Sequence, residues 1–172
     1  MSTPSPARRA ATPAEIEAMG SAIRLRIIRL THQRALTNKE IAERLDKDPA
    51  TTLHHIRKLV ATGFLEAQPA RRGNRGAKEI PYLSTGLSWR LSAGHGGPRV
   101  SIAEAMLQAY LTEVSDAGLA AIDQSRMVVQ VDAAARLELM DRMGALLDEF
   151  AARPPDPDVQ RTAVYVAFYP GE

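Results

Sequence analysis

The segment TNKEIAERLDKDPATTLHHIRKLVATG, residues 37–63, contains the clearest structural signals in this chain. It opens on a capping box, a threonine followed three residues later by Glu40, which starts a helix. Asp48 and Pro49 start a second helix, because Asp accepts from the first free backbone N–H groups and Pro suits the first helical position. Gly63 can adopt the left-handed conformation that ends it. The segment therefore predicts a helix-turn-helix unit, two capped helices joined by a tight turn.

The second helix, residues 49–62, has an apolar and a polar face. Four residues fall within about 60° of Ile56 at 3.6 residues per turn and should join it in the core: Thr52, Leu53, Leu59 and Val60. The opposite face is slim and hydrogen-bonding near its N-terminal end, as a helix entering the DNA major groove must be, and cationic farther along, where phosphates would lie. The candidate DNA contacts are Ala50, Thr51, His54, Arg57 and Lys58, with His55 on a flank and Thr37 at the start of the preceding helix.

A basic hairpin is predicted after these helices. Strand-like stretches at 64–67 and 80–83 enclose a tip rich in glycine and cations, and Pro81 favours an edge position because it has no N–H to donate. Such a tip fits a phosphate backbone or a minor groove, although it could also be a solubilising turn. The candidate contacts in the tip are Arg71, Arg72, Asn74, Arg75 and Lys78.

The charge is divided unevenly along the chain. Residues 20–80 hold 13 Lys/Arg against 6 Asp/Glu, an excess of +7, whereas residues 81–172 hold 7 against 12, an excess of −5. A basic segment beside an acidic one suggests one part that meets a polyanion and one that does something else. Chance unevenness of solvated faces is the alternative.

The second half of the chain predicts a helix over 101–117, a strand over 127–131, a helix capped by Asp132, and a strand over 161–169. The apolar side chains of the first helix spread over about half its circumference, which is too broad for one domain to cover. We therefore expect it to pair with a second copy of the chain. The candidate dimerisation residues are Ile102, Met106, Leu107, Tyr110, Leu111 and Val114.

The fold class expected is α+β, a winged helix-turn-helix domain followed by a helix-strand-helix-strand region for dimerisation or sensing. Its expected parts are a loose tail (1–11), the DNA-binding domain (12–91), a linker (92–100) and the dimerisation or effector region (101–172).

Composition excludes much of enzyme and metal chemistry. With no cysteine and four histidines the chain has no thiolate metal site and no thiol nucleophile. We find no nucleophile, phosphate-loop or dinucleotide motif, so we expect neither an enzyme nor a cofactor or metal. No apolar run approaches the roughly 20 residues of a membrane span, so we expect a soluble, cytoplasmic protein. Four methionines could line a pocket for an apolar effector, although core filling is favoured.

Residues 35–45, 48–60 and 63–66 resemble the winged helix-turn-helix of ArsR-type bacterial transcriptional regulators, and 21–28 resembles the helix ahead of it. The resemblance covers about residues 12 to 90 and implies a homodimer that represses or activates at an operator. It places Thr51, His54, His55 and Arg57 where the family's recognition helix meets DNA.

The chain departs from the metal sensors of that family. They use cysteines on the helix equivalent to 38–45, or histidines and carboxylates on a terminal dimer helix. The first helix here has no cysteine or histidine, and the helix from Ser101 has no histidine. The carboxyl-terminal half goes beyond the minimal family domain and resembles the extension of longer members.

The sequence thus predicts a sequence-specific regulator that binds double-stranded DNA as a homodimer, with the helix 49–62 in the major groove and the tip 71–78 on the backbone or minor groove. Whether the protein also binds a small-molecule effector is left open by the sequence. The alternative is a winged-helix protein-interaction module whose basic face meets an acidic partner.

Overall fold

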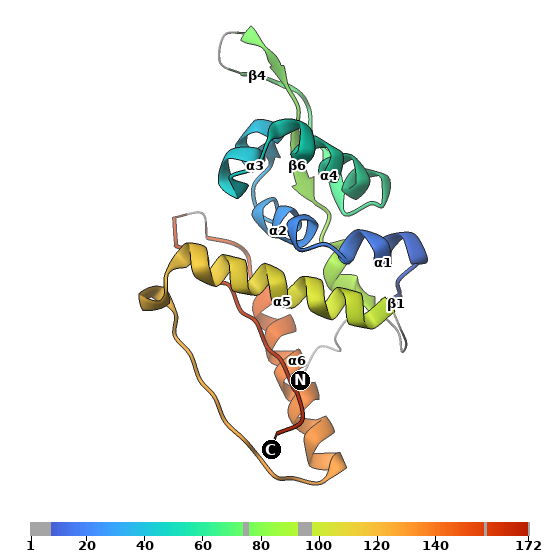
Figure 1. Cartoon of the computed structure of the whole chain (residues 1–172), viewed down its shortest axis with the longest axis vertical. Coiled ribbons are helices and arrows are strands. Elements are labelled where there is room, and N and C mark those ends of the chain that lie inside the picture. The colour runs from blue at the N-terminus through green and yellow to red at the C-terminus, as the bar shows by residue number, and fades with distance from the viewer. Residues whose placement is uncertain (1–7, 74–75, 93–97, 157, 172) are drawn as a thin grey trace. The chain divides into compact units, whose positions relative to one another are not determined.

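The computed structural model describes residues 8–73, 76–92, 98–156 and 158–171. They divide after Gly118 into two compact units, shown in Figure 1. The helices of the first unit are α1 (Pro13–Met19), α2 (Ala22–Leu30), α3 (Asn38–Leu45), α4 (Pro49–Ala61), the 3-10 helix η2 (Leu87–Arg90) and α5 (Pro98–Ala117). Its strands are β1 (Arg9–Ala10), β2 (Leu36–Thr37), β3 (Leu65–Ala67), β4 (Arg71–Arg72), β5 (Lys78–Glu79), β6 (Pro81–Ser84) and β7 (Leu91–Ser92).

Local capping fixes where α3 and α4 begin, and a glycine follows the end of α4, as predicted. In α3 the Thr37 hydroxyl accepts from the Glu40 N–H, and the Glu40 carboxylate accepts from the Thr37 N–H at 2.7 Å. The Asp48 carboxylate accepts from two backbone N–H groups at the start of α4. Gly63 adopts φ +77° just after α4, which only glycine takes readily. The chain therefore turns back directly beneath the end of α4.

The main sheet has the order β2-β6-β3, with both neighbours antiparallel to β6. The predicted edge position of Pro81 is wrong, because the unforeseen strand β2 makes β6 the central strand. Pro81 is tolerated as its first residue, opposite Thr37, where its carbonyl accepts from the Gln68 N–H.

The core of the first unit lies between α2, α3, α4 and the sheet. Ile56 and Leu59 of α4 are fully buried and Thr52 nearly so, which confirms their predicted face. Leu53 is only half-buried. Val60 is exposed, contrary to prediction, because the chain folds back at Gly63 and the buried ring of Phe64 fills the core beneath this end of α4.

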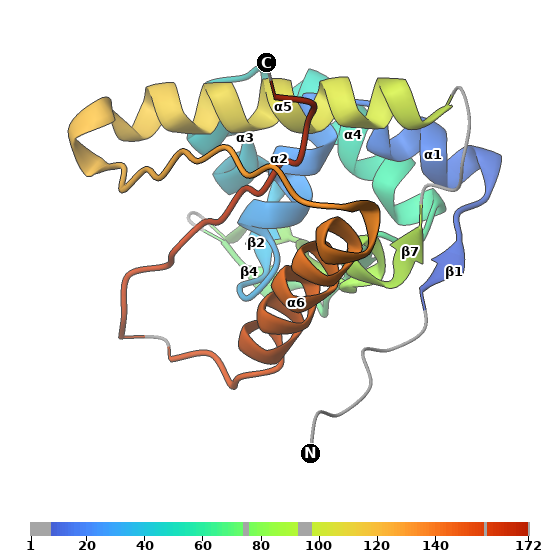
Figure 2. The same ribbon diagram turned by 90° about the horizontal axis from the view of Figure 1, so that it is seen from below.

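Helix α5 belongs to the first unit and packs along α1 and α2 (Figures 1 and 2). Ile102, Ala105 and Ala109 are buried on its inner side, so α5 continues the core of α1 and α2. The unit boundary therefore falls after Gly118, not in the expected linker 92–100, of which 93–97 lie outside the described residues.

The expected loose tail is wrong for residues 8–11. Strand β1 pairs in parallel with β7, with Arg9 opposite Leu91. The Arg9 guanidinium donates twice to the Glu15 carboxylate, at 2.9 and 2.6 Å. Arg8 stacks over the Trp89 ring, 4.8 Å from its centroid. Residues 8–11, which we call the arm, contain few apolar side chains. Backbone pairing and an ion pair order the arm instead.

The second unit contains the 3-10 helix η3 (Leu119–Ala121) and helix α6 (Ala133–Ala151), whose predicted cap is confirmed because the Asp132 carboxylate accepts from the Ala135 N–H. The strands predicted at 127–131 and 161–169 are wrong, since neither stretch pairs into a sheet within the described residues and nearly all their side chains are exposed. An alternating pattern makes a strand only when another strand supplies hydrogen bonds. Among the described residues we find no helix that is both long and apolar enough to span a membrane.

Candidate nucleic-acid interface

The polar face of α4 is open to solvent along its length. Ala50, Thr51, His54 and Arg57 are all exposed, and the core residues of α4 lie on the other side. The N-terminal end is slim, because its first residues are proline, alanine and threonine and its cap is made by Asp48. The face therefore offers hydroxyl and imidazole groups toward the N-terminus and a guanidinium one turn later.

His55 stands on the flank of this face and is half-buried. Burial, with smaller contributions from Arg24 and His54, lowers its pKa, so its ring is neutral near pH 7. Its Nδ1 atom is buried and has no hydrogen-bond partner among the residues that the structure describes. The ring meets that of His54 edge to face, with centroids 5.8 Å apart. His55 is thus placed to support the exposed His54 ring rather than to carry a positive charge.

Two of the predicted contacts have other partners. The Thr37 side chain is 3% exposed and its hydroxyl caps α3. The Lys58 ammonium lies 3.0 Å from the carboxylate of Glu17 in α1. Their positions favour joining elements of the protein over contacting a ligand.

An amide that sequence reasoning missed links the two helices of the turn. The Asn38 Nδ2 atom in the first turn of α3 donates to the Pro49 carbonyl at 3.0 Å, which ties α3 to the start of α4. No local pattern could have signalled this bond, because its partners are eleven residues apart and meet only when the turn has formed.

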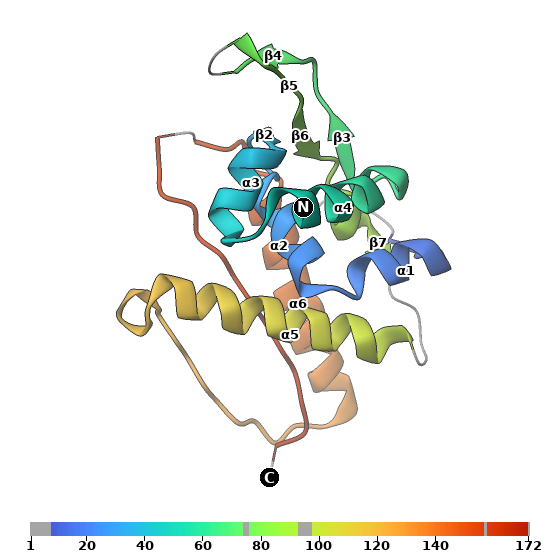
Figure 3. The ribbon, with the colours of Figure 1, turned by 45° about the horizontal axis from the view of Figure 1, so that its top comes forward.

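The basic hairpin β4–β5 stands off the unit beyond β3 and β6 (Figure 3). Arg72 and Lys78 are opposite each other across its strands and are exposed. Arg71 instead reaches the start of α3, where its guanidinium lies 2.8 Å from the Glu40 carboxylate. Asn74 and Arg75, also predicted as contacts, lie outside the described residues.

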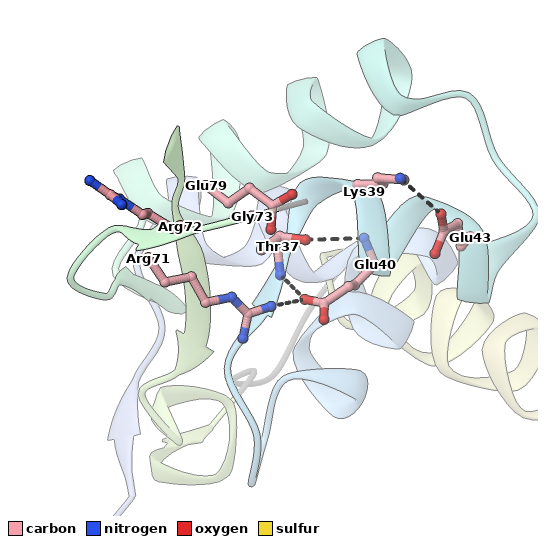
Figure 4. A pocket seen from close by; sticks show the side chains of 8 residues that line it. All are labelled: Thr37, Lys39, Glu40, Glu43, Arg71, Arg72, Gly73 and Glu79. Atoms are coloured by element: carbon pink, nitrogen blue, oxygen red, sulfur yellow. Dashed lines mark hydrogen bonds and ion pairs between the residues drawn. The ribbon is translucent and has the colours of Figure 1, made fainter. Parts of the chain in front are cut away.

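A hollow of about 450 Å³ lies in the angle between the hairpin and α3. Figure 4 shows Arg71 crossing it to Glu40, while Arg72 points away. Burial raises the pKa of Glu40, but hydrogen bonds from the Thr37 backbone and hydroxyl and the Arg71 guanidinium outweigh it, so the pKa is lowered. The Glu40 carboxylate is therefore ionised at neutral pH. In that state it contacts both the N-cap of α3 and Arg71 of the hairpin.

Three arginines of α2 account for part of the basic excess of the first half of the chain, but they contact partners within the protein, on α1 and α5. The Arg24 guanidinium donates to two backbone carbonyls at the end of α1. Arg26 pairs with Asp116 of α5, and Arg29 with Glu113. Sequence counting detected these charges but could not assign them partners up to ninety residues away.

Comparison with known protein families identifies one part of the chain. Residues 19–68, from the end of α1 to just beyond β3, match the family model described as "Helix-turn-helix domain". Residues 19–68 form a helix-turn-helix domain. Its two helices are α3 and α4, and α2 precedes them. A helix-turn-helix domain supports a DNA-binding regulator as the class of protein.

Two solved structures also resemble the chain. An apo double mutant of ZitR from Lactococcus lactis is 17% identical, with 79% of this chain and 84% of that one covered at a TM-score of 0.32. The adhesin competence repressor AdcR from Streptococcus pyogenes is 16% identical, with 83% of each chain covered at a TM-score of 0.29. These TM-scores are low, so the assignment rests on residues 19–68. No curated protein matches the chain.

Proposed function

We propose that the chain is a transcriptional regulator that binds specific double-stranded DNA as a homodimer. Helix α4 enters the major groove, and the β4–β5 hairpin, which we call the wing, lies on the backbone or in the adjacent minor groove. The exposed face of α4 carries this proposal. Thr51 and His54 lie where base edges would be read, and Arg57 lies where phosphates would pass.

The wing supports the same proposal by its charge and shape. Arg72 and Lys78 are solvent-exposed cations on opposite strands of a hairpin that stands off the domain. A cationic hairpin of this kind can follow a phosphate backbone whatever the base sequence. In our proposal α4 therefore supplies specificity, and the wing supplies affinity that depends on salt.

The outer side of α5 supports the homodimer. Leu107 and Leu111 are 44% and 49% exposed, and Met106 is also exposed, whereas Ile102 is buried inside its own chain. We therefore remove Ile102 from the proposed contact set and keep Met106, Leu107, Tyr110, Leu111 and Val114. A two-fold partner would cover this face and present two copies of α4 to DNA.

Selection of bound sequences from a random pool of duplex DNA tests the function. We expect an inverted repeat whose half-sites lie about 34 Å apart or a multiple of that distance. We also expect affinity to fall steeply with salt concentration. If no sequence is enriched and binding is weak and independent of salt, the chain is not a specific DNA-binding protein, and an interaction module with an acidic protein partner replaces it.

A further inference from the structure

The wing is joined to the rest of its domain by an interrupted ladder. The β3–β6 pairing ends where the Gln68 N–H donates to the Pro81 carbonyl. Pairing resumes only at Arg71 opposite Glu79, as a separate two-stranded ladder of two residue pairs. A two-stranded hairpin this short is marginal alone, and the gap allows it to change its angle. A contact outside the strand pairing is therefore needed to fix the angle of the wing.

The side chain that crosses the gap is Arg71. Its guanidinium lies 2.8 Å from Oε2 of Glu40, and that same oxygen accepts from the Thr37 N–H at 2.7 Å. One carboxylate therefore fixes both the start of α3 and the base of the wing (Figure 4). The capping box holds the Glu40 side chain in place, so the arginine meets a rigid partner rather than a mobile one.

We propose that the Arg71–Glu40 ion pair sets the angle of the wing, and that Arg71 is a positioning residue for DNA binding rather than a phosphate contact. The inference rests on the proposed function for its consequence. Arg72 and Lys78 reach the backbone only when the wing points correctly. If the wing samples other angles, only a fraction of the molecules can bind at any moment. The apparent affinity for DNA is then reduced in proportion to that fraction.

The sign of one substitution separates this role from a charge effect. Glu40→Gln removes a negative charge beside the interface, and it also releases Arg71. If Arg71 were a phosphate contact restrained by Glu40, both changes would strengthen DNA binding. If the ion pair positions the wing, binding weakens instead. Glutamine is accepted at this position of a capping box, so α3 still begins at the same residue.

A matched control is available in the same hollow. Glu43 is on the same helix and also lines the hollow, but within the described part of the chain its ion pair is with Lys39 on α3 rather than with the wing. Glu43→Gln removes the same charge and leaves the Arg71 contact intact. It should leave affinity unchanged or slightly raise it.

The angle itself can be measured in the free protein. The chain has no cysteine, so Ala77→Cys in the wing and Ala61→Cys at the end of α4 give a clean pair of spin-label sites in the full chain. We expect a narrow distribution of label distances in the otherwise unchanged chain, and a broader one with Glu40→Gln or Arg71→Gln. Glu43→Gln should leave it narrow.

Affinity for the selected DNA, measured without labels, should fall about threefold with Glu40→Gln, the scale expected for an exposed ion pair. The slope of affinity against salt should not change, and adding Glu40→Gln to Arg71→Gln should cause no further loss. An unchanged distance distribution, or unchanged or tighter binding by Glu40→Gln, overturns the proposal. If the unaltered chain shows no salt-dependent DNA binding, the proposed function fails, and the distance distribution still decides whether the pair holds the wing.

Discussion

Arg29 of α2 and Glu113 of α5 form an ion pair 3.1 Å long across two segments that differ sharply in overall charge. Arg26 and Asp116 repeat the arrangement one turn away along both helices. The basic excess of the first half of the chain and the acidic excess of the second half therefore partly neutralise each other inside one unit. Arg57 of α4, with Arg72 and Lys78 of the wing, forms the proposed DNA-facing set.

We expect Arg29→Ala to leave the salt dependence of DNA binding unchanged, because this arginine holds α5 and does not contact phosphate in our proposal. The measurement is the slope of log affinity against log salt concentration. Its control is Arg153→Ala, which removes an arginine paired with Glu149 on α6. A slope that falls with Arg29→Ala but not with the control would place α2 on the DNA.

Arg72→Ala combined with Lys78→Ala should weaken binding to specific and random DNA alike. Both cations are exposed on the wing, and each lost phosphate contact should reduce the salt slope by about 0.9. Titrations at several salt concentrations measure this. The double substitution Arg142→Ala on α6 with Arg153→Ala just after that helix removes the same charge elsewhere. Equal slopes for the wing variant and the unaltered chain would remove the wing from the interface.

Thr51→Ala should alter sequence preference with little effect on folding, because Thr51 is exposed on the outer face of α4. A lost base contact costs about 1 to 3 kcal/mol of binding free energy. Ile56→Ala, at a fully buried position, should instead cost about 2 to 5 kcal/mol of unfolding free energy. Thermal melts and competition binding distinguish them. A larger loss of stability from Thr51→Ala would reverse the two faces of α4.

Leu107→Glu or Leu111→Glu should convert the proposed homodimer to monomers. Both side chains are about half-exposed in the single chain, so each variant should fold, while a charge at a two-fold interface is buried twice. Sedimentation at micromolar concentration measures this, and DNA affinity should fall with it because the second half-site is lost. Gln108→Glu adds the same charge at a polar position of α5. Dimers that persist in both leucine variants would move the contact to another surface.

The stability of the first unit should fall in acid through Glu15. Hydrogen bonds from the Arg9 guanidinium and the Thr12 N–H lower its pKa from 4.5 to about 2. Because the folded-state pKa is lowered, the ionised carboxylate stabilises the fold at neutral pH, and this contribution disappears as the pH falls from about 4.5 to about 2. The difference in unfolding free energy between the unaltered chain and Glu15→Gln should shrink over that range.

The fluorescence of Trp89, the sole tryptophan, reports this acid transition because Arg8 of the same arm lies over its ring. A stability difference that stays constant throughout the acid range would show that the Arg9–Glu15 contact does not form in solution.

Features set by neighbouring residues could be predicted from the sequence. The capping box at Thr37, the start of α4 and the turn at Gly63 each depend on residues within four positions of one another, so the local pattern alone predicts them. The exposed face of α4 follows in the same way from the helical repeat.

Features set by distant partners could not be predicted. Pro81 lies in a central strand because β2, more than forty residues earlier, pairs with it. Arg71 and Lys58 look like any other surface cation until the fold brings Glu40 and Glu17 beside them. The apolar alternation at 161–169 contains no information about a partner strand, and the described part of the chain supplies none.

The parallel pairing of Arg9 with Leu91 also sets the order in which the molecule can be assembled during synthesis. The arm leaves the ribosome before the rest of its unit, and its backbone partner follows only after α1 to α4 and the sheet have been made. Contacts between residues so far apart in sequence form late, because a long loop must close before they can be made. The arm is therefore translated before the rest of its unit but is among the last parts of that unit to reach its final place.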